Sequence, residues 1–157
     1  MATKDLTSVL DAAGVAYESL PHPHTETAAG EAEALQLAPE EVAKTLAVQT
    51  PSGYLRAVIP ASERLDLRKL ARLLEVGAKR VHLASEQDLA RDYPEFELGA
   101  VPPLGGERRD PVVVDQRLAE RESLAIEAGT HEESLRLRTA DLLRLAEARV
   151  DDICKDG

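Results

Sequence analysis

The chain has 157 residues, of which 43% are hydrophobic and 31% charged, so we expect a single folded domain that does not span a membrane. Its formal net charge of −10 argues against broad binding to a DNA or RNA backbone, which requires clustered Lys and Arg. A single cysteine, Cys154, excludes an internal disulfide and suits the reducing cytoplasm.

Helix and strand signals follow one another irregularly along the chain. Leu6, Val9, Leu10 and Ala13 recur at helical spacing, and Gly14 after them is a typical helix stop. Further on, apolar runs are separated by turn-forming residues, as strands are. In chain order we expect helices at residues 6–13, 27–36, 40–43, 67–74, 85–91 and 139–146, and strands at residues 15–20, 45–48, 55–59, 80–83, 112–114, 123–127 and 135–137.

These elements predict an α+β domain with a mixed sheet, because helices and strands do not alternate strictly. Glycines and prolines crowd into residues 93–110, which we therefore expect to form an irregular loop of the kind that often carries function. No linker or repeat divides the chain. We expect one domain over residues 1–150 and an acidic tail at residues 151–157, in which the thiol of Cys154 is inert.

Lys44 is the first candidate for chemistry, because it follows the predicted helix at residues 40–43 and precedes an apolar strand. We expect it to be held near the sheet and partly shielded from water. A charged Lys44 would donate hydrogen bonds to a carbonyl or ribose oxygen, whereas a neutral one would act as a base. The alternative is that Lys44 only complements a helix dipole.

A glycine- and proline-rich loop is the second candidate. Gly99 allows its backbone to approach a ligand closely, and Pro102 and Pro103 stiffen the chain. The amides of Gly99, Ala100 and Val101 are suited to binding a developing oxyanion or a substrate carbonyl. An ordinary surface turn would carry the same residue types.

Three histidines form the third candidate set. His22 and His24 would face the same way in an extended segment and would need His131 to complete a zinc site, but no HExxH motif or cysteine cluster supports a metal, and we expect none. His24 beside Thr25 is expected to order a loop. His131 lies in a predicted turn before the strand at residues 135–137, where it is either a ligand contact or a polar turn residue.

A series of short motifs resembles the YbaK and prolyl-tRNA synthetase-type editing domains, which include free-standing aminoacyl-tRNA deacylases. The resemblance covers nearly the whole chain, from about residue 17 to residue 145. The motifs that carry it are His24–Ala28, Val42–Leu46, Ala57–Ala61, Arg64–Leu70, Ala78–Val81, Gly99–Pro103 and Thr139–Leu143.

The resemblance implies that the predicted domain is an editing domain with a mixed, curved sheet flanked by short helices. Lys44 matches the lysine that family members require, and Gly99–Pro103 matches the GxxxP loop that positions the substrate carbonyl or amino group. His24, Thr25 and Thr45, which lie within the matching motifs, are then expected to bind substrate. No metal or organic cofactor is implied.

We therefore predict a cytoplasmic hydrolase that acts in trans on mischarged aminoacyl-tRNA, of the tRNA(Pro) type or a related one, and so supports translation fidelity. Lys44 would fix the ribose and the acyl carbonyl, the Gly99 loop would stabilise the oxyanion, and a water or the neighbouring ribose hydroxyl would attack. The acidic charge limits the footprint to the tRNA acceptor end or favours recruitment by a synthetase. Neither DNA nor a membrane is an expected partner.

Two other functions fit the same residues. The first is a non-catalytic module that binds an aminoacyl or nucleotide end beside a synthetase, and the second is hydrolysis of a small ester or amide unrelated to tRNA. Residues 127–133 differ from the glycine-rich turn of cysteine-clearing relatives. We therefore expect His131 to line the pocket and to recognise a different acyl group.

Overall fold

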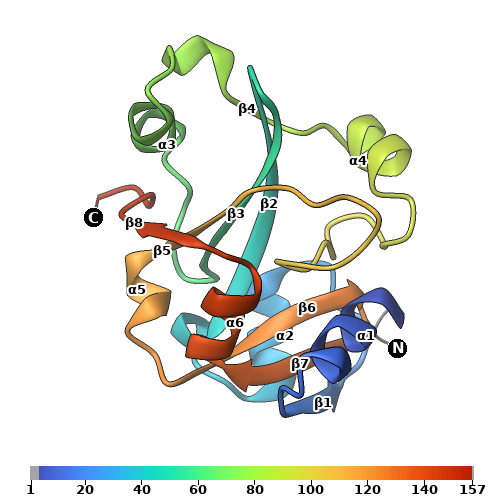
Figure 1. Ribbon diagram of the computed structural model, residues 1–157. Coiled ribbons are helices and arrows are strands. Elements are labelled where there is room, and N and C mark those ends of the chain that lie inside the picture. Colours follow the sequence, from blue (N-terminus) through green and yellow to red (C-terminus); the bar gives the residue numbers. More distant parts are fainter. Residues whose placement is uncertain (1–3, 157) are drawn as a thin grey trace.

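The computed structural model describes residues 4–156, which form an α+β domain built on one mixed sheet (Figure 1). None of its helices is long and apolar enough to cross a membrane. The elements are α1 (Lys4–Ala12), β1 (Tyr17–Pro21), α2 (Ala28–Leu35), the 3-10 helix η1 (Pro39–Glu41), β2 (Val42–Thr50), β3 (Gly53–Pro60), α3 (Leu67–Leu74), the 3-10 helix η2 (Ala78–Arg80), β4 (His82–Leu83), α4 (Glu86–Asp92), β5 (Val112–Asp115), α5 (Gln116–Ala119), β6 (Ser123–Thr130), β7 (Glu133–Arg138), α6 (Thr139–Leu145) and β8 (Arg149–Asp151).

The strands are ordered β1-β7-β6-β2-β3-β5-β8, and the short β4 pairs with β2. The pairs β1–β7, β6–β7 and β2–β3 are antiparallel, whereas β2–β6, β3–β5 and β5–β8 are parallel. The long β2–β3 hairpin extends away from the rest of the sheet, with α3 and α4 on either side of it (Figure 1). The predicted α+β class with a mixed sheet flanked by short helices is confirmed.

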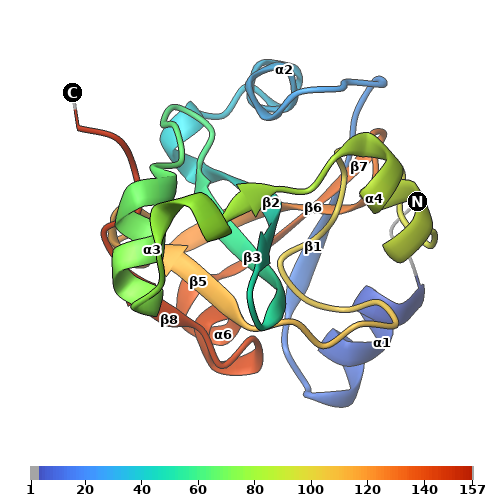
Figure 2. The same cartoon turned by 90° about the horizontal axis from the view of Figure 1, so that it is seen from above.

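Helices cover both faces of the sheet, as Figure 2 shows with α2 on one side and α1 and α6 on the other. Along β6 the side chains alternate between these layers. Leu124 and Ile126 pack in the main core with α1, α5 and α6, whereas Ala125 packs against α2. Glu127, two residues beyond Ala125, therefore returns to the α2 face.

Two helices begin at residues whose side chains cap them. Asp66 caps α3 by accepting hydrogen bonds from two backbone amides, and Ser85 forms a capping box with Asp88 at the start of α4. Residues 93–110 contain no helix or strand, as predicted.

Two predicted elements were wrong in part. The helix expected at residues 40–43 is a single 3-10 turn, and Val42 and Ala43 already belong to β2 because they pair with β3 and β6. Of the strand expected at residues 80–83, only His82 and Leu83 are extended. The short elements α5 and β8 were not predicted.

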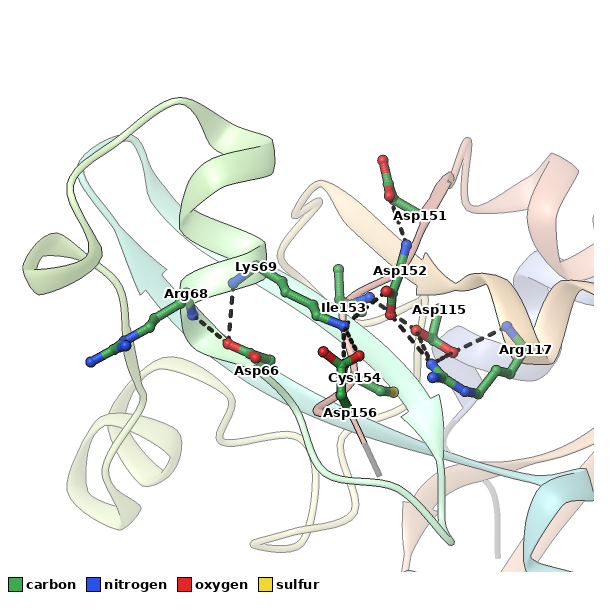
Figure 3. Close-up of polar contacts among 10 residues, drawn as sticks. All are labelled: Asp66, Arg68, Lys69, Asp115, Arg117, Asp151, Asp152, Ile153, Cys154 and Asp156. Atoms are coloured by element: carbon green, nitrogen blue, oxygen red, sulfur yellow. Dashed lines mark hydrogen bonds and ion pairs between the residues drawn. The ribbon is translucent and has the colours of Figure 1, made fainter.

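Part of the segment predicted as an acidic tail is packed against the sheet. After β8, Ile153 and Cys154 are fully buried. Lys69 on α3 binds this segment through Asp152 at 2.8 Å and Asp156 at 2.7 Å (Figure 3). Burial, the main cause, raises the pKa of the Cys154 thiol to about 12, so the thiolate is disfavoured and the thiol is unreactive near neutral pH.

Candidate active site

Lys44 faces α2 because the side chains of β2 alternate between the two faces of the sheet. Val42 packs against α2, whereas Ala43 packs in the main core on the opposite face. Lys44, as the next residue, returns to the α2 face, where its side chain is half-buried. The expectation that Lys44 lies near the sheet and is partly shielded from water is thus met.

A cavity of about 370 Å³ lies beside Lys44, and most of the residues that line it are small or apolar. Of the residues predicted to form the site, Lys44, Thr45, Gly99 and Val101 line this cavity. The loop before α2 contributes Glu26 and Thr27. The site therefore joins two distant predicted motifs, the lysine strand and the glycine loop.

Gly99 has a positive φ of 82°, a left-handed conformation that favours glycine. A Cβ added at Gly99 would stand 3.5 Å from Cε1 of His131, so the loop backbone closely approaches that ring. The amide of Ala100 already donates to the carbonyl of Glu97 at 3.0 Å. Among the described residues no acceptor is found for the amides of Gly99 and Val101, which makes these two the candidate donors to a ligand.

A buried arginine fixes the far end of this loop. The Arg56 side chain, on β3, is 1% exposed and pairs with Asp110 at 3.2 Å. Its guanidinium also donates to the carbonyls of Pro102 at 3.0 Å and Gly105 at 2.9 Å. Tyr93 donates to the same Asp110 carboxylate at 2.6 Å. The loop is thus irregular but held at several points.

The structure places the other predicted residues around the cavity rather than in it. His131 and Thr25 line a much smaller adjoining pocket of about 10 Å³. His24 is exposed and packs edge-on against His131, with ring centroids 5.3 Å apart. The buried residues Ala100, Pro102 and Pro103 do not line the cavity.

His131 lies in the turn between β6 and β7, as predicted. Its backbone carbonyl accepts from the amide of Thr25 at 3.0 Å, and its Nε2 donates to the carbonyl of Leu98. His131 thereby links the loop before α2 to the residue next to Gly99. Among the described residues no group of three His, Cys, Asp or Glu side chains is placed to hold a metal ion.

Two buried acids were missed by the sequence analysis. Glu31 on α2 accepts a hydrogen bond from the hydroxyl of Ser134, and His22 Nε2 lies 3.1 Å from the same hydroxyl oxygen. Burial raises the pKa of Glu31. Glu127 on β6 lines both the cavity and the small pocket. An acidic residue within the otherwise apolar run 124–128 was the signal that could have revealed it.

Glu127 is also close to Lys44. The parallel strands β2 and β6 pair Val42 with Ala125 and Ala43 with Ile126, so Lys44 and Glu127 occupy the next position along both strands. Burial, chiefly, and the nearby charge of Glu31 raise the pKa of Glu127 well above its ordinary value, and Lys44 opposes this shift. The site therefore presents a cation and an acid side by side, next to backbone donors.

The chain belongs to the aminoacyl-tRNA editing domain family. The sequence profile of that family matches residues 22–145. This range includes Lys44, Gly99, Glu127 and His131, so the matched region contains the whole candidate site.

A curated relative agrees with this assignment, and solved structures share the fold. The multifunctional Ser/Thr-tRNA deacylase ProXp-y of Escherichia coli (strain K12) is 33% identical over 95 residues, which span 60% of this chain and 55% of that protein. The match thus spans about half the length of this curated relative. The hypothetical protein APE2540 has a TM-score of 0.86 at 25% identity, with 96% of this chain and 99% of that chain covered. A protein described as a candidate trans-editing enzyme for prolyl-tRNA synthetase has a TM-score of 0.85 at 24% identity, with 96% and 95% covered, and supports the fold alone.

Proposed function

We propose that this protein is a trans-editing deacylase, which hydrolyses the ester between a wrongly attached amino acid and the terminal adenosine of a tRNA. The observation that carries this proposal is the position of Lys44, half-buried at a cavity that Gly99 and Val101 also line. Membership of the aminoacyl-tRNA editing domain family supports it.

The reaction requires little from the protein beyond placement and charge. In the proposed mechanism Lys44 donates hydrogen bonds to the acyl carbonyl or to the ribose, and the amides of Gly99 and Val101 stabilise the oxyanion. A water adds to the carbonyl carbon and gives up a proton. The bond to the ribose oxygen then breaks and this oxygen takes up a proton, which releases the amino acid. Since an aminoacyl ester is already activated, these contributions suffice.

Seryl and threonyl esters are the first substrates to test. The similarity to ProXp-y, which is named a Ser/Thr-tRNA deacylase, favours them. A cavity of about 370 Å³ whose lining is mostly small or apolar accepts an acyl group of that size together with part of the ribose. Small acyl groups are therefore expected to be preferred over large ones.

The tRNA is expected to touch the protein only with its acceptor end, or to be delivered by a synthetase. The net charge of −10 disfavours an extended footprint on phosphate. Lys69, one of the basic residues of α3, is already bound to Asp152 and Asp156. An acceptor-stem minihelix should therefore be hydrolysed almost as fast as the full tRNA.

The test is deacylation of a panel of misacylated tRNAs, with the corresponding small aminoacyl esters in parallel. A trans-editing enzyme cleaves seryl- or threonyl-tRNA and leaves correctly charged prolyl-tRNA intact. Cleavage of the small esters but of no tRNA would instead assign a general esterase. Binding of aminoacyl-tRNA without any turnover would assign a non-catalytic module.

A further inference from the structure

Glu127 is a buried acid at the cavity, and the proposed mechanism does not use it. Its side chain comes from β6 and lines the cavity that Lys44 also lines. The residue is 8% exposed, and its Oε2 atom is buried without a hydrogen-bond partner among the described residues. Native proteins rarely leave a buried carboxyl oxygen unpaired, and a ligand is one way of supplying the missing partner.

Within residues 4–156 no side chain or amide donates a hydrogen bond to the Glu127 carboxyl group. Lys44 lies at the neighbouring register position, but the described residues place no carboxylate oxygen within ion-pair distance of it. Glu31 is the second acid nearby and repels a negative charge on Glu127. The Ser134 hydroxyl, opposite Glu127 across the β6–β7 pair, is already used by Glu31.

The other acid at the cavity does not compete for this role. Glu26 lies on the loop before α2, and its side chain is 81% exposed. Water therefore solvates Glu26, whereas Glu127 is enclosed. A ligand that enters the cavity meets one buried acid, and this acid stands beside one half-buried cation.

An aminoacyl ester has a complementary arrangement of groups. Its carbonyl oxygen, which needs a donor, and its α-ammonium group, which needs an acceptor, are attached to adjacent carbon atoms. Lys44 and Glu127 project from the same face of adjacent strands, which lie about 4.8 Å apart. The two side chains can therefore bind the two groups of one substrate together.

We propose that Glu127 binds the α-ammonium group of the aminoacyl ester and thereby restricts the enzyme to substrates with a free amino group. This rests on the proposed function, because it concerns the substrate of the same cavity. Lys44 attracts the carbonyl end while Glu127 attracts the amino end, so the acyl group can enter in only one orientation. Esters with an acylated amino group, such as peptidyl-tRNA, are then refused, because they lack the cation and are larger.

The high pKa of Glu127 is compatible with this role. A cation that arrives beside the carboxyl group favours its ionised form, so the bound ammonium takes over the stabilisation that water cannot give. In the free protein, burial and the charge of Glu31 disfavour the ionised form. Substrate binding therefore shifts Glu127 towards its ionised form.

The experiment measures binding of two non-hydrolysable probes, in which the ester is replaced by an amide to 3′-amino-3′-deoxyadenosine. One probe carries a seryl group, and the other carries the same acyl group without its amino group. Loss of the amino group should weaken binding to the wild type about ten- to a hundredfold, as expected for a charge-assisted hydrogen bond. In Glu127→Gln, which keeps the shape of the side chain, the two probes should bind within about threefold of one another.

Glu33→Gln is the matched control, because it removes an exposed acid of α2 that does not line the cavity and should behave as the wild type. An equal loss of affinity in Glu127→Gln and in the wild type would overturn the proposal. So would equal affinity of the wild type for both probes, or no binding of either, and these outcomes need no variant to fold.

Hydrolysis separates this proposal from the proposed function. If Glu127 governs probe binding but no misacylated tRNA is cleaved, the deacylase assignment fails and the ammonium site stands. If seryl-tRNA is cleaved and acetylation of its amino group slows Glu127→Gln as much as the wild type, the ammonium site fails and the deacylase assignment stands.

Discussion

Lys44 on β2 and Glu127 on β6 stand next to one another on the same face of the sheet, one step beyond the paired residues Ala43 and Ile126. Neither side chain is in contact with bulk water over most of its surface, since Lys44 is half-buried and Glu127 is 8% exposed. The fold thus holds a cation and an acid together at a cavity that is otherwise mostly small or apolar.

The first prediction concerns the dependence of stability on pH. The raised pKa of Glu127 means that the folded protein keeps this proton at pH values where the unfolded chain has lost it. The stabilisation that this proton gives the folded protein is fully present below pH 4.5, the ordinary pKa of a glutamate. It is lost as the pH rises through the pKa of Glu127 in the folded protein. Glu127→Gln removes this loss, so at about pH 8 it should be more stable than the wild type by about 1–3 kcal/mol.

Urea unfolding of both proteins at about pH 5 and about pH 8 measures this effect. The charged groups that act on Glu127 are Glu31 and Lys44, and His22 and His131 act on Glu31. The difference between the proteins should grow with pH. A difference that is constant or shrinks with pH would show that Glu127 is not a destabilising charge.

Many of the helices and loops were predictable, because they depend on residue types that lie close together in the sequence. Asp66 and Ser85 are residue types that cap helices and so indicate the starts of α3 and α4. Glycines and prolines indicate the irregular loop. The helix expected at residues 40–43 was wrong since tertiary pairing of Val42 and Ala43 with neighbouring strands outweighed local propensity.

The site was predictable only in part. Lys44 and Gly99 came from motifs, but Glu127 depends on which strand lies beside β2, and this parallel pairing leaves no short-range trace in the sequence. Arg56 was missed for the same reason, because its partners Pro102, Gly105 and Asp110 lie on a distant loop.

The second prediction concerns the loop that Arg56 holds. Arg56→Ala leaves the buried Asp110 paired only with the more exposed Arg108, and it removes the donor to the carbonyls of Pro102 and Gly105. It should therefore lower the free energy of unfolding by about 3–5 kcal/mol. Arg108→Ala is the control, because Arg108 also pairs with Asp110 but its side chain is 38% exposed, and it should cost less than about 1 kcal/mol. Equal costs in urea unfolding would contradict the role given to Arg56.

The third prediction separates backbone strain from catalysis at Gly99. Gly99→Ala and Gly53→Ala both place a side chain at positive φ, so each should lose about 1–2 kcal/mol of stability. Gly53 lies at the hairpin tip with open space around it, whereas Gly99 lines the cavity beside His131. Only Gly99→Ala should slow deacylation. Similar rates for the two variants would remove the loop from the mechanism.

The fourth prediction concerns His131, which lies next to Gly99 and holds Thr25 through its backbone carbonyl. Removal of its ring in His131→Ala enlarges the adjoining pocket and should relax the preference between seryl and larger acyl groups. The measurement is the ratio of kcat/KM values for seryl-tRNA and a larger aminoacyl-tRNA. An unchanged ratio would show that His131 does not select the acyl group.

The most direct test of the account is the single-turnover rate of deacylation by Lys44→Ala on the best misacylated tRNA. Loss of a cation that binds the reacting ester should slow this step about a hundred- to a thousandfold, with the fold intact. Lys155→Ala, which removes an exposed lysine near the end of the chain, should react at the wild-type rate. Full activity of Lys44→Ala would contradict the central claim that Lys44 acts on the substrate.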